Sequence, residues 1–188
     1  YGMIFVCPEG EKSWYWDSPV SPKSRFETYI CYELTGEVEK HYRTRNNRNS
    51  RAISGYSMGG HGALWLAFRH PDIFGACGSM SGGVDIRPFP DNWNMKDQLG
   101  TYAGNPRRWD EHTVINRLPY NTDSGTLAII IDCGTEDFFF QVNNQLHEKM
   151  LKLKIPHDYI TRPGGHNHTY WNNAADYQLL FFRKFFQQ

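Results

Sequence analysis

The chain has 188 residues, with 20 lysine and arginine residues against 20 aspartate and glutamate residues, so its formal net charge is zero at neutral pH. A chain without excess positive charge is not expected to bind nucleic acid or an anionic membrane surface. Its apolar runs are far shorter than the roughly 20 residues that a membrane-spanning helix needs. The length corresponds to a single domain that can bury a substantial core.

Four cysteines occur, and none has the spacing of a metal-binding pair with a second cysteine or a histidine. Three of them lie in or beside apolar runs, where a free cysteine behaves as a small buried hydrophobe. We therefore expect all four to be reduced core residues: Cys7, Cys31, Cys77 and Cys133.

The amino-terminal part contains one predicted strand and one predicted helix. Residues 1–10 (YGMIFVCPEG) begin as a continuous apolar run that ends at a proline and a glycine, which predicts a strand buried on both faces. The stretch SRFE at residues 24–27 has the Ser-x-x-Glu form of a helix capping box. From there, apolar residues recur at four-residue spacing and predict one helix face: Phe26, Ile30, Leu34, Val38 and Tyr42.

Strands and helices alternate from residue 51 onward. Strands alternating with helices predict an α/β fold, in which a mostly parallel sheet is flanked by helices on both faces. The predicted strands are at 51–55, 74–81, 125–134 and 157–162, and the predicted helices at 58–70, 141–153 and 172–186.

A long polar insertion, at about residues 84–124, separates the second and third of these strands. Unstructured loops of that length are uncommon in compact domains and are usually functional or disordered. Spaced aromatic residues favour an ordered flap at the carboxyl edge of the sheet, where α/β folds bind ligands. A packed surface excursion is an equally good explanation. The aromatic residues are Trp93, Tyr102, Trp109 and Tyr120.

Residues 55–59 read Gly-Tyr-Ser-Met-Gly and lie between a predicted strand and a predicted helix. A chance Gly-x-Ser-x-Gly is expected in only about a few percent of chains this long. A nucleophile elbow also requires the strand before it and the helix after it. In so tight a turn, side chains at positions 55 and 59 are expected to collide with the neighbouring backbone. The turn would leave the Ser57 hydroxyl exposed above a helix amino terminus, which favours developing negative charge.

A serine hydroxyl becomes a nucleophile when a histidine takes its proton and an acid orients that histidine. In this kind of fold the chain order is serine, acid, histidine, each on a loop after a strand. The strands at 125–134 and 157–162 are each followed by suitable side chains. The candidates are Asp132, Glu136 and Asp137 for the acid, and His166 and His168 for the base.

The residues alone leave the choice within each group open. Asp132 still belongs to the apolar run and can cap the strand, whereas Asp137 lies further out, where a loop can reach the histidine. His166 follows a glycine pair and lies nearest the strand, and His168 competes with it. Two histidines without a carboxylate at ligand spacing are more often structural than metal ligands, so we predict no metal and no other cofactor. His61, inside the helix after the elbow, is predicted to have a structural role, packing or capping behind the nucleophile.

Three stretches resemble the putative-esterase family of α/β hydrolases: GYSMGGHGAL at 55–64, CGTEDFF at 133–139 and PGGHNHTYW at 163–171. That family contains S-formylglutathione hydrolases, tributyrin-type, feruloyl and acetyl-xylan esterases, and mycolyltransferases. SWYWDSP at 13–19, followed by YICYEL at 29–34, is more similar to the tributyrin and feruloyl branch. The resemblance extends through nearly the whole chain and implies an α/β-hydrolase fold.

The resemblance also implies roles for individual residues. Ser57 would be the nucleophile, Asp137 the orienting acid and His166 the base. The backbone N–H of Met58 would be one donor of the oxyanion hole, as is the residue after the nucleophile in this fold. Three aromatic residues would line the substrate cleft, although core packing explains each of them equally well: Trp14, Tyr15 and Trp171.

The sequence departs from that family at its amino-terminal end. Relatives carry several upstream strands and a His-Gly loop that donates the second N–H of the oxyanion hole, whereas one predicted strand and one predicted helix precede the elbow strand here. We therefore expect residues 1–188 to form a single domain that is the carboxyl-terminal portion of a longer hydrolase and lacks the amino-terminal strands. Losing one oxyanion donor typically costs about a hundred- to a thousandfold in turnover. The exposed sheet edge would allow a homo-oligomer to form.

The sequence thus predicts a serine carboxylesterase that acts through an acyl-enzyme on short-chain or aromatic esters, acetyl or feruloyl. Its substrate would be a small molecule or an ester linked to a plant polysaccharide, and no nucleic-acid or membrane partner is predicted. Three alternatives stay open: a thioesterase of the S-formylglutathione type, an enzyme that transfers the acyl group to a sugar, and a non-catalytic fragment or binding module that retains the triad. A secreted or periplasmic location would fit the polysaccharide substrate, and a cytoplasmic one the thioesterase.

Overall fold

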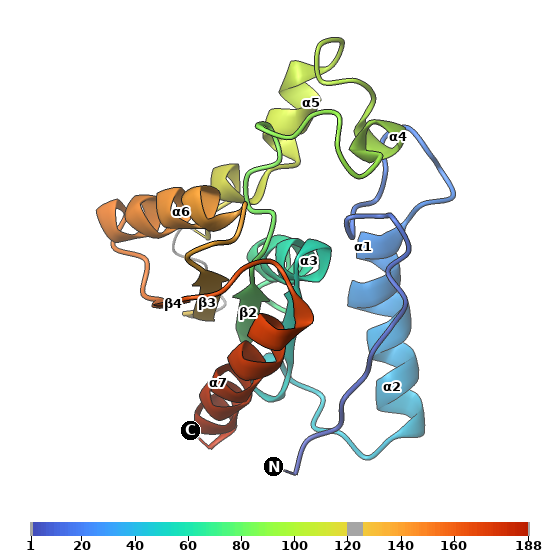
Figure 1. The fold of residues 1–188 in the computed structure, drawn as a ribbon. Helices are drawn as coiled ribbons and strands as arrows, with labels where there is room; N and C mark the ends of the chain where they lie inside the picture. The colour runs from blue at the N-terminus through green and yellow to red at the C-terminus, as the bar shows by residue number, and fades with distance from the viewer. Residues whose placement is uncertain (1, 120–125, 188) are drawn as a thin grey trace.

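The centre of the protein is a parallel sheet of four strands in the order β1-β2-β3-β4. The computed structural model describes residues 2–119 and 126–187. Figure 1 shows the strands with helices packed around them. The strands are β1 (Ala52–Tyr56), β2 (Ala76–Met80), β3 (Ala128–Gly134) and β4 (Asp158–Arg162), and the main flanking helices are α3 (Met58–Arg69), α6 (Phe140–Lys152) and α7 (His168–Phe186).

Helices cover both faces of the sheet. Ile129 and Ile131 of β3 belong to a large core cluster that includes residues of α3 and α6. Ile130, between them, points to the opposite face and packs with Phe182 of α7. Because side chains alternate along a strand and β3 is covered on both sides, its sequence is a nearly continuous apolar run.

The four strands and three helices predicted from residue 51 onward are confirmed, as is the α/β fold class. Gly125, where the third predicted strand starts, lies outside the described residues. The last helix begins at His168 rather than near Asn172 because Asn167 caps it: its side-chain oxygen accepts a hydrogen bond from the backbone N–H of Tyr170 at 3.0 Å. None of the described helices is long and apolar enough to span a membrane.

Residues 2–10 do not form the buried strand that their apolar run predicts. They are irregular chain, and the side chains of Ile4, Phe5 and Val6 are 52%, 63% and 45% exposed. A strand must pair its backbone groups with a neighbour, and this segment pairs with no strand of the described residues. Cys7 is also exposed, so the prediction of a core cysteine is wrong there. The other three cysteines are buried free thiols: Cys31, Cys77 and Cys133.

The predicted helix near residue 26 forms in three pieces. α1 (Phe26–Thr28) continues into a π-helical segment, η1 (Tyr29–Leu34), and then into α2 (Thr35–His41). The predicted apolar face is therefore only partly correct, because the π-helical turn changes the register of the side chains. Ile30 is buried, whereas Tyr42 lies beyond the helix and is 60% exposed.

The predicted capping box is wrong, because Arg25 occupies the N-cap position and no side chain caps the helix. Glu27 instead reaches helix α3, where its carboxylate accepts hydrogen bonds from Trp65 Nε1 at 2.9 Å and Arg69 Nε at 2.8 Å, and pairs with His70 Nε2 at 2.8 Å. Burial alone would raise the pKa of Glu27, but the hydrogen bonds from His70 and Arg69 lower it to about 2. The carboxylate thus links α1 to α3.

The insertion at about 84–124 is folded over most of its described length (Figure 1). Trp109 is fully buried, donates from Nε1 to the Gly100 carbonyl at 2.9 Å and packs against Tyr102. Trp93 is 40% exposed, and Tyr120 lies outside the described residues. The elements of the insertion are α4 (Met95–Leu99), α5 (Pro106–Glu111) and η3 (Val114–Asn116); a further short turn, η2 (Arg48–Ser50), precedes β1.

Candidate active site

Ser57 lies in the turn between β1 and α3, with backbone angles φ 53° and ψ −118°. A positive φ is strained for a residue with a side chain, and such strain is concentrated at functional sites. Gly55 makes this turn possible, because a Cβ there would lie 2.5 Å from the carbonyl carbon of Gly59. The prediction that a side chain at Gly59 would collide is wrong: a Cβ there would meet no atom within 4 Å.

Three side chains from separate loops are in hydrogen-bond contact at this turn. His166 Nε2 is 2.8 Å from Ser57 Oγ, and His166 Nδ1 is 2.8 Å from Asp137 Oδ2 and 3.0 Å from Oδ1. Asp137 is buried, and its Oδ1 also accepts a hydrogen bond from the backbone N–H of Phe139 at 2.8 Å. The structure therefore brings together Ser57, Asp137 and His166 in an arrangement that can pass a proton from the serine hydroxyl to the imidazole.

The loops that carry Asp137 and His166 are joined by backbone hydrogen bonds. The N–H of Thr135 donates to the Arg162 carbonyl at 2.9 Å, and the N–H of Glu136 donates to the Gly164 carbonyl at 3.0 Å. A Cβ on Gly134 would overlap that same Gly164 carbonyl oxygen, so the approach requires glycine. The two loops therefore hold the acid and the base at a fixed separation.

The other candidates for acid and base lie outside this arrangement. Asp132 is fully buried and accepts hydrogen bonds from Tyr170 Oη and Arg162 Nη2, each at 2.5 Å. Burial raises the pKa of the Asp132 carboxyl. Glu136 and His168 are exposed. Geometry thus separates alternatives that the sequence leaves open.

Aromatic rings enclose the His166 imidazole. Phe138 lies 4.2 Å from it between ring centroids, and Trp171 meets it edge-on at 4.8 Å. The Trp171 indole also stacks on Tyr56, with 4.4 Å between ring centroids. Trp171 therefore lies against the histidine, and it is not among the residues that line the adjoining cavity.

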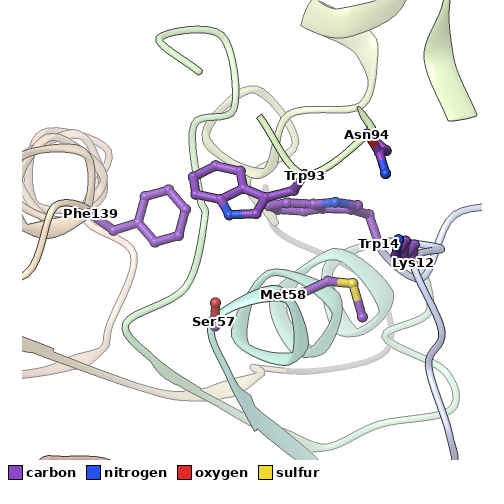
Figure 2. Close-up of a pocket in the computed structure, with 7 residues that line it drawn as sticks. All are labelled: Lys12, Trp14, Ser57, Met58, Trp93, Asn94 and Phe139. Atoms are coloured by element: carbon purple, nitrogen blue, oxygen red, sulfur yellow. The ribbon is translucent and has the colours of Figure 1, made fainter. Parts of the chain in front are cut away.

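A cavity of about 350 Å³ opens beside Ser57. Figure 2 shows the indoles of Trp14 and Trp93 close together above the Met58 side chain, with Phe139 on the Ser57 side of them. Of the three aromatic residues predicted to line the cleft, Trp14 does so. The complete lining consists of Lys12, Trp14, Ser57, Met58, Trp93, Asn94 and Phe139.

Tyr15 and Trp171 are not among the residues that line this cavity. The Tyr15 ring packs on helix α3, where a Cβ on Gly62 would overlap it. Burial, together with the nearby Tyr56, raises the pKa of the Tyr15 hydroxyl. Tyr15 therefore packs on α3 and is not part of the cavity lining.

Sequence reasoning missed four lining residues as members of the site. Trp93 was noted only as one aromatic residue of the insertion, and Phe139 directly follows the acid in the stretch DFFF, which is the signal that points to it. Lys12 and Asn94 carry no sequence signal, because only the folding of two distant loops brings them to one cavity.

The two indoles that form the cavity wall both come from left-handed backbone. Trp14 and Tyr15 have φ values of 54° and 61°, and Trp93 and Asn94 have φ values of 51° and 55°. Each such residue costs on the order of 1–3 kcal/mol and persists only where the surroundings hold it. The cavity wall is therefore built at an energetic cost, as is common at functional sites.

His61, on α3, is fully buried. Its Nδ1 lies 3.0 Å from the Gly83 carbonyl oxygen, and its ring meets Trp14 and Trp16 edge-on, each at 5.1 Å. Burial lowers the pKa of His61 to about 4. The prediction that His61 packs behind the elbow agrees with this placement.

Met58 is the first residue of α3, so its backbone N–H has no partner carbonyl within the helix. The aligned peptide dipoles also place partial positive charge at this end of the helix. An anion that forms beside Ser57 would be stabilised there. Residues 2–119 and 126–187 contain no group of three or more His, Cys, Asp or Glu side chains that could hold a metal ion.

A family model described as "Putative esterase" matches residues 3–182. The chain belongs to this esterase family. The protein has the α/β-hydrolase fold of esterases: the solved structure of a ferulic acid esterase superposes on it with a TM-score of 0.75, at 30% identity, covering 91% of the chain and 64% of that protein.

Two curated relatives agree with the family. An esterase of Mycobacterium tuberculosis is 28% identical over 191 residues, which cover 87% of the chain and 41% of that protein. The S-formylglutathione hydrolase of Paracoccus denitrificans is 27% identical over 159 residues, covering 82% of the chain and 54% of that protein. The chain thus spans about two fifths to one half of the length of these two relatives.

Proposed function

We propose that the chain is a serine carboxylesterase that acts through an acyl-enzyme. Ser57 is the nucleophile, His166 the general base and Asp137 the acid that orients it. The observation that carries this proposal is the unbroken relay from Ser57 Oγ through His166 to Asp137, with 2.8 Å at each step. A serine hydroxyl becomes an effective nucleophile only with such support. Membership of an esterase family supports the same chemistry.

The reaction proceeds in two halves around the same proton relay. Ser57 Oγ bonds to the ester carbonyl carbon while its proton moves to His166 Nε2, and the Asp137 carboxylate stabilises the resulting imidazolium. The carbon–oxygen bond to the alcohol then breaks, and His166 gives its proton to the departing oxygen. A water molecule next loses a proton to His166 and attacks the acyl carbon, which releases the acid and restores Ser57.

Negative charge develops on the carbonyl oxygen in both halves. We assign one stabilising hydrogen bond to the backbone N–H of Met58, at the amino terminus of α3. Removing one such donor typically costs about a hundred- to a thousandfold in turnover, so this N–H is a substantial part of the proposed machinery.

The cavity supports an ester of an aromatic or short-chain acid as substrate. Its volume is about 350 Å³, and two indoles and a phenyl ring form its walls. The 30% identity to a ferulic acid esterase supports the same class. We extend the proposal to acetyl and feruloyl esters carried by small molecules or by plant polysaccharide.

Covalent labelling by a fluorophosphonate, read as intact mass, tests the proposed nucleophile. We expect one label per chain in the unsubstituted protein, none in Ser57→Ala and almost none in His166→Ala. Ser54→Ala is the matched control, because Ser54 is an exposed serine on the preceding strand, β1, and outside the relay. A folded protein that takes no label, or takes it on another residue, would contradict the proposal and favour a binding module.

Thioester hydrolysis is the second candidate, supported by the identity to the S-formylglutathione hydrolase of Paracoccus denitrificans. The two candidates share the acyl-enzyme and differ in the leaving group. Comparing kcat/KM for S-formylglutathione and for an aryl ester separates them. The aromatic cavity walls lead us to expect the higher value for the aryl ester.

A further inference from the structure

The proposed reaction leaves one charged side chain of the cavity without a role. Lys12 and Asn94 line the cavity together with Ser57, and Figure 2 shows them on the far side of the indoles from Ser57. Lys12 is the only charged group in the cavity lining of the described residues. No carboxylate among residues 2–119 and 126–187 forms an ion pair with it. Its ammonium group is therefore available to a ligand.

The cavity between Ser57 and Lys12 is lined mainly by apolar side chains. The indoles of Trp14 and Trp93 are in contact, with 5.9 Å between ring centroids and 49° between planes, and Trp93 also packs on Phe139 at 5.3 Å. The Met58 side chain lies below the indoles in Figure 2. A flat apolar group would be held between the thioether and the rings.

We propose that this cavity selects esters whose acyl group ends in a carboxylate, separated from the ester carbonyl by a flat apolar spacer. The ester lies at Ser57, the spacer between Met58 and the indoles, and the carboxylate at Lys12 Nζ and the Asn94 amide. We place the charge on the acyl part because that part stays attached to Ser57 while the alcohol must leave. This inference rests on the proposed esterase function and names its substrate class.

The selectivity is expected to be local and moderate. The formal net charge of the chain is zero, so long-range attraction of anions contributes little. Lys12 is exposed, and exposed ion pairs are partly screened by water and salt. A preference of up to about fivefold is therefore expected, and it should decrease as ionic strength rises.

The test compares two esters that differ in charge but hardly in shape. The acyl pair is 4-nitrophenyl 4-carboxybenzoate against 4-nitrophenyl 4-carbamoylbenzoate, and an alcohol pair places the same two groups on the phenol of a phenyl butyrate. We expect a higher kcat/KM for the carboxylate in the acyl pair, mainly through a lower KM. A preference confined to the alcohol pair, or none in either pair, would overturn the proposal.

Substitutions at Lys12 test whether this side chain causes the preference for the carboxylate ester. Lys12→Met keeps the approximate length of the side chain but removes its charge, so the kcat/KM values of the two esters should become equal. Lys12→Glu should make the carboxylate ester the poorer substrate. Lys23→Met, which removes an exposed lysine that does not line the cavity, should preserve the ratio. A ratio that survives Lys12→Met would show that another group recognises the carboxylate.

Binding to the Ser57→Ala protein separates this inference from the proposed esterase function. The fluorescence of Trp14 and Trp93 reports occupancy of the cavity without turnover. Tighter binding of the carboxylate ester, lost in the Ser57→Ala, Lys12→Met double variant, would support the selectivity even in a protein that fails to hydrolyse either ester. Equal binding of both esters, together with fluorophosphonate labelling of the unsubstituted protein, would overturn the selectivity and leave the esterase function intact.

Discussion

Asp132 and Asp137 both lie at the carboxyl end of β3, but their surroundings differ. Asp137 faces the His166 imidazole, whereas Asp132 holds Arg162 and Tyr170. Asp137→Asn should keep the shape of the site but favour the wrong imidazole tautomer, so we expect turnover to fall by about 10⁴. Steady-state kinetics on a good aryl ester, with circular dichroism to check the fold, measures this.

Asp132→Asn is the matched control for that substitution. It removes the charge that the Arg162 guanidinium pairs with, so we expect a loss of about 1–3 kcal/mol in the free energy of unfolding. Turnover should stay within about tenfold of that of the unsubstituted protein. Chemical denaturation measures the first and kinetics the second. The assignment of the two carboxylates would be reversed if Asp132→Asn abolished turnover while Asp137→Asn only lowered stability.

Local residue patterns predict the candidates for the relay, and the family resemblance implies the choice of Asp137 and His166 among them, but neither predicts their surroundings. Chain order and position after strands pointed to Ser57, to a small acidic cluster and to two histidines, because these features are local. The selection of Asp137 and His166 depends on loop contacts such as that between Glu136 and Gly164. Lys12 and Asn94 could not be found, since no local pattern places two distant loops at one cavity.

The strands and helices likewise divide into those that local sequence patterns predict and those that depend on contacts with distant residues. β3 was predicted correctly because a strand covered on both faces needs a nearly continuous apolar run. Residues 2–10 carry a similar run without a partner strand, and they stay irregular and exposed. The capping pattern at 24–27 failed because the Glu27 carboxylate binds side chains of α3 instead of capping its own helix. A strand or helix is thus predictable when its local sequence pattern agrees with the neighbours that it has in the folded protein.

The elbow between β1 and α3 depends on one glycine rather than two. Gly55→Ala would force its Cβ against the backbone of Gly59, so we expect displacement of Ser57 and loss of more than about 99% of fluorophosphonate labelling. Gly59→Ala should retain labelling, since its Cβ meets open space, and alanine favours the helix by up to about 1 kcal/mol. Equal loss of labelling in both variants would contradict this steric explanation.

For the whole molecule, we expect buried histidines to determine how the free energy of unfolding decreases as the pH falls below about 6.5. Burial lowers the pKa of His61 to about 4, below the value of about 6.5 in an unfolded chain. Between these pH values the unfolded state binds a proton that the folded state excludes, so the free energy of unfolding falls as pH falls from about 6.5 to 4. The loss from His61 amounts to up to about 3 kcal/mol.

His61→Asn keeps a donor for the Gly83 carbonyl and should flatten this slope, measured by urea denaturation at several pH values. Burial also lowers the pKa of His112, so this histidine destabilises the folded protein at acid pH in the same way. In His61→Asn, the free energy of unfolding should therefore still depend on pH, but less steeply. Glu27, with a pKa of about 2, contributes stability that is lost only below about pH 4.5. An unchanged slope between pH 6.5 and 4.5 in His61→Asn would contradict this assignment.

The extent of the hydrolase domain to which this chain belongs stays a prediction. β1 is an edge strand of the described sheet, and the chain spans 41% of the mycobacterial relative. We propose that residues 1–188 form one domain, the carboxyl-terminal portion of a longer hydrolase, with the insertion at about 84–124. Pairing of the β1 edge with a second copy is the associated prediction for the oligomeric state.

The exposed Cys7 has a practical consequence. Cys31, Cys77 and Cys133 are buried, and burial raises the pKa of each of their thiols, which suppresses the reactive thiolate. A maleimide dye should therefore attach to Cys7 first, on the same irregular segment that leads to Lys12. The chain thus carries its own exposed conjugation point, five residues before Lys12, which suits it for immobilisation or dye attachment without engineered cysteines.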